Sequence, residues 1–442
     1  MTAEDTAVAA TPPAVPGLPL LGNALQMMGD VQGFLVDNYR RMGPIYRVRA
    51  LSQAFTVLAG SDANQLLRDH GDALFSSEDT MGGLDRQFQM RVHVLRGRPH
   101  RHLRAILATG LSRGLLTARW DAVAESTRQA LASWQDRPNL PVVDACQRLA
   151  AAQLSIALTG ADSAARFETL RWAFELVLDV EVTGKLPALV LRRPAYRRAR
   201  TSIMDFARAA LDERAATARS DTPDLIDQAI AAVDQNGHPY PPETRAGMAL
   251  QGYFAGINTV AYLYSFLLYV LARRPDVFAR VADEVDAVHD GDHLPVERIR
   301  DLPALHATVL ETLRMFPPAP GSTRVAVEPF EFAGHRIERG TRVLIATCVP
   351  HRLARHFADP DRFDIDRDFA GARRAGVYAP FSVGSHTCLG AGMTGALSVA
   401  TMAMLVHRMR PHLRRPQRPL RIQATPGPNP GNRFTLRMTP RG

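Results

Sequence analysis

The residues with the clearest chemical potential lie in one ten-residue segment near the C-terminus, which reads FSVGSHTCLG and ends at Gly390. A cysteine thiolate that binds a metal needs backbone N–H donors, close approach of the chain and shelter from bulk water. Gly384 and Gly390 permit a tight loop around Cys388, and Phe381 can cover the sulfur. The apolar run that follows predicts a helix, whose start favours negative charge. The segment therefore predicts a metal-binding thiolate, with a buried structural cysteine as the alternative.

The spacing F-x-x-G-x-x-x-C-x-G resembles the haem-binding loop of the cytochromes P-450. The resemblance implies that Cys388 is the thiolate ligand of the iron of haem b, which favours O–O cleavage. It also implies that Phe381, Gly384, His386 and Gly390 bind the cofactor. The fold it implies is mainly α with small β-sheets, with a long central helix over the haem.

A candidate for that central helix is the uncharged stretch of residues 246–272. Its length alone would suit a transmembrane helix. Polar residues such as Gln251 and Asn258 interrupt it, and a helix that is apolar all round is equally what the core of a large protein requires. We expect a buried core helix and no transmembrane anchor.

Residues 255–259 of this stretch read AGINT and resemble the oxygen-side motif of the same family, alanine or glycine, then Gly-x-acid-Thr. The resemblance implies three catalytic residues, Gly256, Asn258 and Thr259. Gly256 leaves room for dioxygen, and the Thr259 hydroxyl orders a proton chain. Asn258 stands where the family has an acid, and an amide cannot carry a titrating proton. Proton delivery is therefore the open question, and a Thr259 hydroxyl bonded to its own helix is the alternative.

The family also carries a Glu-x-x-Arg pair, but four such pairs occur in this chain. Only Glu311/Arg314 is followed at once by a proline stop. The segment FADPDRF, residues 357–363, resembles a later family motif, and Arg362 is expected to complete a buried triad that supports the cysteine loop. The other three pairs are interpreted as surface pairs: Glu125/Arg128, Glu168/Arg171 and Glu297/Arg300.

Haem propionates need cationic or donor partners, and four residues match family positions for them. His100 and Arg104 form an i,i+4 pair on one helix face. Arg324 follows a proline-rich turn, and His386 lies inside the cysteine loop. The same spacing at His335/Arg339 and His351/Arg355 is not assigned to the cofactor.

Composition and element order limit the domain organisation. Four prolines between residues 12 and 19 predict an extended start, so we expect a disordered tail over residues 1–15 and a single domain over 16–442. Short strands are expected at 45–49, 55–58, 330–337 and 342–345, and helices at 115–134, 199–218 and 391–406. The formal charge of +9, from 53 basic and 44 acidic residues, is spread along the chain and does not require nucleic acid. Three cysteines, none in a C-x-x-C pair, suit a reducing cytoplasm.

The leading hypothesis is a cytoplasmic, monomeric haem-thiolate monooxygenase that inserts one oxygen atom from O2 into a lipophilic small molecule, by hydroxylation or epoxidation. Because no flavin or ferredoxin module is recognisable in the chain, electrons are expected from a separate ferredoxin and ferredoxin reductase. A role in secondary (natural-product) metabolism is expected. The alternatives are a peroxide-driven peroxygenase, which loss of the acid leaves open, and a haem-binding sensor without turnover. The expected substrate-facing side chains are Met81, Leu84, Phe88, Leu178, Val180 and Leu186.

Overall fold

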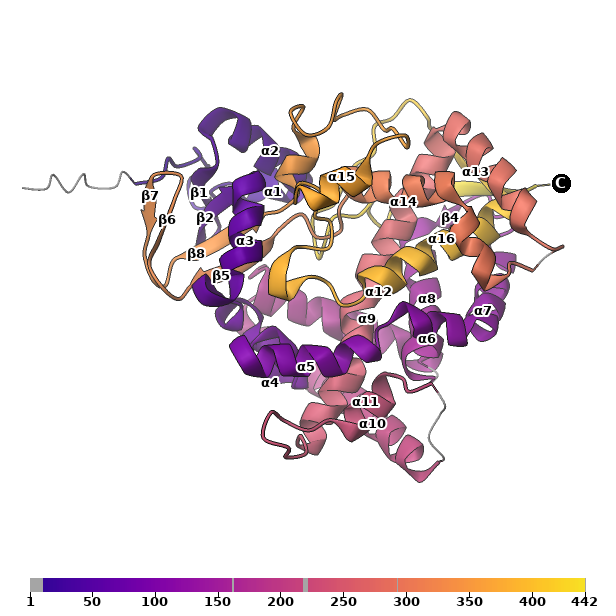
Figure 1. The fold of residues 1–442 in the computed structure, drawn as a ribbon, viewed down its shortest axis with the longest axis horizontal. Coiled ribbons are helices and arrows are strands. Elements are labelled where there is room, and N and C mark those ends of the chain that lie inside the picture. The colour runs from indigo at the N-terminus through magenta and orange to yellow at the C-terminus, as the bar shows by residue number, and fades with distance from the viewer. Residues whose placement is uncertain (1–10, 161–162, 218–221, 292, 442) are drawn as a thin grey trace, which may run out of the picture.

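The computed structural model describes residues 11–160, 163–217, 222–291 and 293–441 (Figure 1). The first ten residues of the expected tail lie outside this part of the chain. Its last residues do not form a tail: the Arg47 N–H donates to the Pro13 carbonyl at 2.7 Å, and the Val15 N–H donates to the Arg47 carbonyl at 2.8 Å. Val15 is also buried. The boundary at residue 15 was therefore wrong, because the segment pairs with the edge of the first strand.

The longest element is α12, Pro242–Arg273, which runs through the middle of the molecule (Figure 1). It begins with Pro242 at its first position, where the missing N–H costs nothing. It is long and apolar enough to span a membrane, but 67% of its most apolar window is buried inside the protein. Tyr264 and Phe266 are fully buried. This confirms the expected core helix.

The remaining helices surround α12, and α8 (Val142–Leu154) packs against it most extensively. The expected helix at 115–134 is split in two at Arg119. The helix expected at 199–218 begins earlier and ends at Ala216, and residue 218 lies outside the described residues. The helix expected at 391–406 is confirmed within a slightly longer one. The other helices are α1 Ala24–Gly29, α2 Val31–Met42, α3 Ser61–Leu74, α4 Glu78–Phe88, α5 Gly97–Thr109, α6 Arg113–Ala118, α7 Trp120–Ala132, α9 Phe167–Val177, α10 Pro194–Ala216, α11 Leu225–Ala231, α13 Pro275–Val288, α14 Pro303–Met315, α15 Phe369–Arg374 and α16 Ala391–Arg408.

Three small sheets complete the fold. The strands expected at 45–49, 55–58 and 342–345 are present, whereas the single strand expected at 330–337 is wrong, because the chain turns back at residues 333–334 to form two short antiparallel strands. The largest sheet has the order β1-β2-β8-β5-β3, with β2 and β8 parallel and the other neighbours antiparallel. A three-stranded sheet has the order β4-β10-β9, and β6 with β7 forms a hairpin. The strands are β1 Ile45–Ala50, β2 Gln53–Ala59, β3 Phe75–Ser76, β4 Leu140–Pro141, β5 Ser322–Ala326, β6 Phe330–Phe332, β7 His335–Ile337, β8 Arg342–Ala346, β9 Met409–Leu413 and β10 Thr435–Pro440.

The large sheet and the β6–β7 hairpin gather on one side of the molecule, and most helices lie on the other (Figure 1). One continuous core cluster joins the central helices, including α8, α12, α14 and α16, while two smaller clusters cover the two faces of the large sheet. The loop between α15 and α16 carries Cys388. Because α16 packs against α12, the start of α16 brings this loop to the central helix.

Candidate functional site

The cysteine loop is closed by its own backbone. The Cys388 N–H donates to the Phe381 carbonyl at 2.9 Å, and the Thr387 N–H donates to the Gly384 carbonyl at 3.1 Å. Gly384 has a φ of 76°, and a Cβ there would lie 2.8 Å from the Leu67 carbonyl oxygen on α3. Any other residue would be strained at this position, so Gly384 allows the loop to lie directly on α3.

Cys388 is accessible to solvent, although many protein atoms lie around its side chain. Burial raises the pKa of the Cys388 thiol, while the Gly390 N–H and the Arg104 guanidinium act in the opposite direction. The loop alone therefore does not hold a free thiolate at neutral pH. A bound cation would supply the missing stabilisation, because metal coordination deprotonates a thiol.

A buried guanidinium that has no acidic partner among the described residues lies near this loop. Arg324, on β5, is 7% exposed, and burial lowers its pKa to about 10. Its Nη1 donates a hydrogen bond to the carbonyl of Thr323, at 2.8 Å. Among the described residues its Nε has no partner. A buried cation is costly unless it is paired, so this position calls for an anion.

Two imidazoles, those of His100 and His386, lie in the same region as Arg324. His100, on α5, is fully buried, and within the described chain neither ring nitrogen has a hydrogen-bond partner. Its ring stacks on that of His386 with 4.1 Å between centroids. Asp72, on α3, accepts a hydrogen bond from Ser385 at 2.5 Å and lies 4.0 Å from His386. Ligand atoms of Asp72, His100 and His386 lie within 4.8 Å of one another.

Arg104 connects this cluster to the cysteine, because its Nη2 donates to the Thr387 carbonyl inside the loop. The structure thus brings together the four predicted propionate contacts and Cys388. Unpartnered buried donors on Arg324 and His100 next to a cysteine loop fit the two propionates and the iron of a haem. Asp72 was missed, because nothing in its sequence context separates it from other surface acids.

A second missed residue is His93, which precedes α5. Gln251 Nε2 lies 2.8 Å from His93 Nε2, and the imidazole must be the acceptor because an amide NH2 has no lone pair to offer. Burial, together with the charges of Arg324 and Arg104, lowers the pKa of His93 to about 4. A neutral His93 therefore connects α12, through Gln251, to the surroundings of Arg104 and Arg324.

On α12 the side chains of Ala255 and Thr259, one turn apart, are exposed although most of the helix is buried. The Thr259 hydroxyl donates to the Ala255 carbonyl at 2.7 Å. The alternative prediction, a Thr259 hydroxyl bonded to its own helix, therefore describes this hydrogen bond. Because the Thr259 side chain is exposed, the lone pairs of its hydroxyl oxygen remain available.

Gly256 does not face the same way. A Cβ there would lie 2.6 Å from Leu154 Cδ1 on α8, and a Cβ on Gly252 would lie 2.2 Å from Leu158 Cδ1. The absent side chain therefore makes room for the neighbouring helix. The expectation that Gly256 leaves room for dioxygen is corrected to a role in helix packing.

Asn258 is half-buried and points toward α8, where its Oδ1 accepts a hydrogen bond from Gln147 Nε2 at 2.7 Å. The same Gln147 nitrogen lies 3.2 Å from Glu175 Oε1 on α9. An acid is therefore present near this position, but it comes from another helix.

Of the four Glu-x-x-Arg pairs only Glu311/Arg314 is buried, with both side chains fully inaccessible. Two hydrogen bonds of 2.6 and 2.8 Å join them. Arg314 also donates to the carbonyl of His351 at 2.6 Å. The His351 ring in turn accepts the Ala379 N–H at 2.9 Å, two residues before Phe381. The expected support of the cysteine loop is thus present.

The third member of the triad is Arg367, and the assignment of Arg362 was wrong. Arg367 Nε lies 3.1 Å from Glu311 Oε1, whereas Arg362 is exposed and contributes its carbonyl oxygen to Arg314 and Arg367. Both arginines follow aspartates in similar local sequence, so the motif matched five residues too early.

This correction gives a prediction. Arg367→Ala should lower the free energy of unfolding by about 2–3 kcal/mol, because it leaves Glu311 short of a partner and frees several carbonyls. Arg362→Ala should change it by less than about 0.5 kcal/mol, as expected for an exposed side chain. The shift of the urea denaturation midpoint measures both, and equal shifts would contradict the assignment.

The expected substrate-facing residues divide into two groups. Leu84 and Phe88 are fully buried and Val180 is 8% exposed, and all three belong to the main core. The Phe88 ring packs edge-on against Phe174, with 5.2 Å between centroids. These three are core residues, because their side chains have no free surface to offer a ligand. The remaining candidates are partly exposed: Met81, Leu178 and Leu186.

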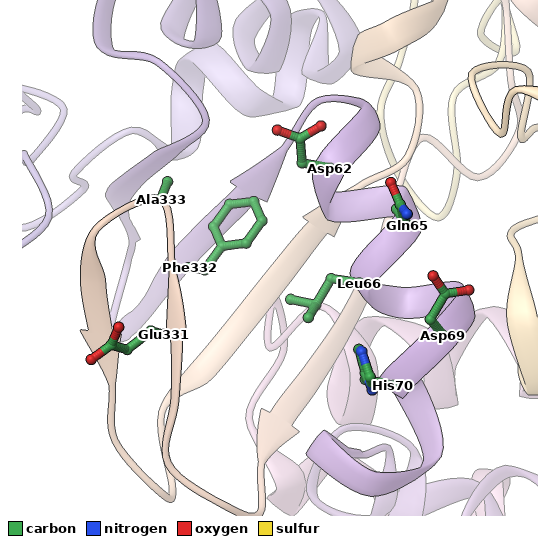
Figure 2. Close-up of a pocket in the computed structure, with 8 residues that line it drawn as sticks. All are labelled: Asp62, Gln65, Leu66, Asp69, His70, Glu331, Phe332 and Ala333. Atoms are coloured by element: carbon green, nitrogen blue, oxygen red, sulfur yellow. The ribbon is translucent and has the colours of Figure 1, made fainter.

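A separate hollow lies on the outer surface between α3 and the β6–β7 hairpin, with a volume of about 330 Å³ (Figure 2). Asp62, Asp69 and His70 of α3 and Glu331 of the hairpin line it, with the buried Phe332 at its base. None of the predicted site residues lines it, and it is not part of the candidate site.

The family model of cytochrome P450 matches residues 12–159 and 176–432 of the chain. The chain belongs to the cytochrome P450 family. Two solved structures share this P450 fold: a retinoic acid-bound cyanobacterial CYP120A1 (TM-score 0.84, 21% identity, 98% of this chain and 100% of that one) and a cytochrome P450DA haem domain (TM-score 0.86, 19% identity, 98% and 99%).

Curated relatives place this P450 among monooxygenases. Cyclooctat-9-en-7-ol 5-monooxygenase of Streptomyces melanosporofaciens is 29% identical over 343 residues, 72% of each chain. Sterol 14alpha-demethylase of Mycolicibacterium vanbaalenii is 31% identical over 190 residues, 41% of this chain and 42% of its own. Human lanosterol 14-alpha demethylase is 26% identical over 392 residues, 84% of this chain and 75% of its own. The chain is a P450 monooxygenase, and the family implies a haem-thiolate cofactor.

Proposed function

We propose that Cys388 ligates the iron of haem b and that the protein inserts one atom of O2 into a lipophilic small molecule, by hydroxylation or epoxidation. The observation that carries the proposal is that Arg324 and His100 are buried beside the Cys388 loop with nitrogen atoms that have no hydrogen-bond partner among the described residues. Such a pair is suited to bind an anion. Arg104, Arg324, His100 and His386 would hold the propionates. Phe381, Gly384 and Gly390 would shape the loop around the thiolate.

When bound, the haem supplies the redox chemistry that activates O2. The side chains of α12 supply the surroundings in which this happens. Thr259 offers an exposed hydroxyl oxygen that can accept a hydrogen bond from water and so order it, because its one O–H donates to the Ala255 carbonyl. Ala255 keeps the adjoining surface small and apolar. Asn258 can donate or accept a hydrogen bond but holds no titrating proton.

A lipophilic substrate is supported by the relatives, whose names specify a sterol and cyclooctat-9-en-7-ol, and by the partly exposed Met81, Leu178 and Leu186. We place the protein in the cytoplasm, as a monomer in natural-product metabolism. A separate ferredoxin and its reductase would supply the electrons.

Reconstitution tests this proposal. The purified protein, incubated with a candidate sterol or terpenoid, NADPH, ferredoxin and ferredoxin reductase, should form an oxygenated product that incorporates ¹⁸O from ¹⁸O2. Product formation from hydrogen peroxide alone, with none from the reductase system, would replace the proposal with a peroxygenase. Asn258, in place of the family's acid, is the observation that keeps this second candidate.

The Thr259 hydroxyl gives a further prediction. Thr259→Ala should lower product formed per NADPH on the order of 10²-fold, because the hydroxyl that positions a proton-carrying water is lost. The electrons should then appear as hydrogen peroxide, which a peroxidase-coupled dye measures. Thr259→Ser keeps the hydroxyl and should behave like the wild type. If both variants lose product equally, the threonine acts through its methyl group.

A further inference from the structure

Three side chains from three helices form a hydrogen-bonded chain that ends beside Thr259. Gln147, on α8, is 3% exposed, and its Nε2 donates to Asn258 Oδ1 on α12 at 2.7 Å. The same nitrogen donates to Glu175 Oε1 on α9 at 3.2 Å. The two N–H groups of one amide are therefore both used, and they join a carboxylate to the residue that precedes the predicted catalytic threonine.

The donor inventory of these groups fixes their orientation. An ionised carboxylate only accepts hydrogen bonds, so Glu175 requires that Gln147 present its NH2 group. Gln147 then donates to Asn258, which must present Oδ1 to it. Among the described residues the Nδ2 of Asn258 has no hydrogen-bond partner, so this donor remains for water or a ligand.

We infer that Glu175 is a positioning residue whose protonation state sets the hydrogen-bond polarity of Asn258. With Glu175 ionised, Asn258 offers its Nδ2 donor beside Thr259. With Glu175 protonated, the new O–H donates to Gln147 Oε1, and the two amides each rotate by half a turn. Asn258 then donates Nδ2 to Gln147 and offers Oδ1 as an acceptor beside Thr259. The proton is taken from solvent at Glu175, and no bond other than this O–H forms.

The surroundings of Glu175 favour such a change. Burial raises the pKa of the Glu175 carboxyl, and the charges of Asp179 and Glu168 add to this, while Arg171 and the Gln147 hydrogen bond oppose it. The charge of Arg171 acts on two carboxylates, because its Nη2 also lies 2.6 Å from Glu168 Oε2. From α8, Asp144 and Arg148 pair with Arg171 and Glu168, and from α12 the neutral phenol of Tyr262 faces the group.

The switch itself rests on the three side chains, and its consequence at Thr259 rests on the proposed function. α12 has no titrating side chain at position 258, and Glu175 on α9 takes this place. We predict that lowering the pH through the raised pKa of Glu175 changes Asn258 from a donor to an acceptor.

A pH-titrated infrared difference spectrum of the purified haem protein tests the first step. A carbonyl stretching band of a protonated carboxylic acid should grow as the pH falls, and Glu175→Gln should lose it. Glu168→Gln, on the same helix and contacting the same Arg171, should keep the band. A band that persists in Glu175→Gln would overturn the assignment.

The second step is tested by nuclear magnetic resonance of the ¹⁵N-labelled side-chain amides in the reduced, carbon monoxide-bound protein. The Asn258 amide resonance, assigned through its loss in Asn258→Ala, should shift with the same pH midpoint as the infrared band. The shift should disappear in Glu175→Gln. It should also disappear in Gln147→Met, a variant of similar size in which the infrared band persists. An Asn258 resonance that still follows pH in Gln147→Met would overturn the relay.

The third readout connects the switch to turnover. The share of NADPH electrons recovered as hydrogen peroxide should change at the pH midpoint of the infrared band in the wild type, and stay constant in Glu175→Gln. In Glu168→Gln it should still change, together with the infrared band, but at a lower pH, because the Glu168 charge that helps to raise the pKa of Glu175 is gone. If this share is constant in the wild type while both spectroscopic changes occur, the switch is supported and the role of Thr259 in the proposed function is contradicted.

Discussion

Replacing Cys388 by alanine should abolish the long-wavelength Soret band of the reduced, carbon monoxide-bound protein. This band reports thiolate ligation of haem iron, and Cys388 is the one cysteine of the three with an exposed side chain. The loss should be complete, because the nearby loop offers no second thiol. An absorption spectrum of the dithionite-reduced protein under carbon monoxide measures it.

The other two cysteines provide matched controls. Cys146 and Cys348 are at most 1% exposed, and burial raises the pKa of each to about 12. Cys146→Ala and Cys348→Ala remove a core sulfur and should cost stability of about 1 kcal/mol each, without changing the position of the band. A thiolate spectrum that survives in Cys388→Ala and is lost in either control would place the ligand elsewhere.

Glu311→Gln should lower the free energy of unfolding by about 3–5 kcal/mol, the typical loss when one partner of a buried ion pair is removed. Arg314 is fully buried and would keep its charge without a carboxylate, and Arg367 would lose the same partner. The N–H of Asp364 also donates to Glu311 Oε1, at 2.8 Å, and glutamine would leave one oxygen for all the donors that now share two. Equilibrium urea denaturation, followed by circular dichroism, measures the loss.

The chain contains its own control, because residues 168–171 have the same sequence, ETLR, as residues 311–314. Glu168 is 55% exposed and pairs with Arg171 at the surface. Glu168→Gln should therefore cost less than about 1 kcal/mol. Equal losses in Glu168→Gln and Glu311→Gln would contradict a structural role for the buried pair. Haem content after purification should fall in Glu311→Gln alone, because His351 transmits the support of Arg314 to the cysteine loop.

Much of the site followed from local sequence, because those features depend on residue type at fixed spacing. A glycine at 384 permits the positive φ that the loop needs, and the cysteine four residues later lies on that loop whatever surrounds it. The uncharged stretch that became α12 had to be buried somewhere, since its apolar surface runs around the whole helix. His100 and Arg104 share a helix face for the same local reason.

Which side chains meet across the molecule depended on packing that spacing does not encode. Arg367 and Arg362 both follow aspartates, and only the path of the chain after residue 357 decided which one reaches Glu311. Gly256 faces α8 because of how two long helices cross, and Leu84 and Phe88 are covered by helices distant in sequence.

Sequence by itself determined a glycine-rich loop around Cys388, a long buried helix carrying Thr259, and the family to which both features belong. Tertiary structure decided which of two identical tetrapeptides is a buried support. It also placed a carboxylate, Glu175, within reach of Asn258 through Gln147. The physical reason is range. Backbone conformation and helix periodicity act over a few residues, whereas burial and hydrogen bonding between helices join residues that are 28 positions apart, as Gln147 and Glu175, or 111 apart, as Gln147 and Asn258.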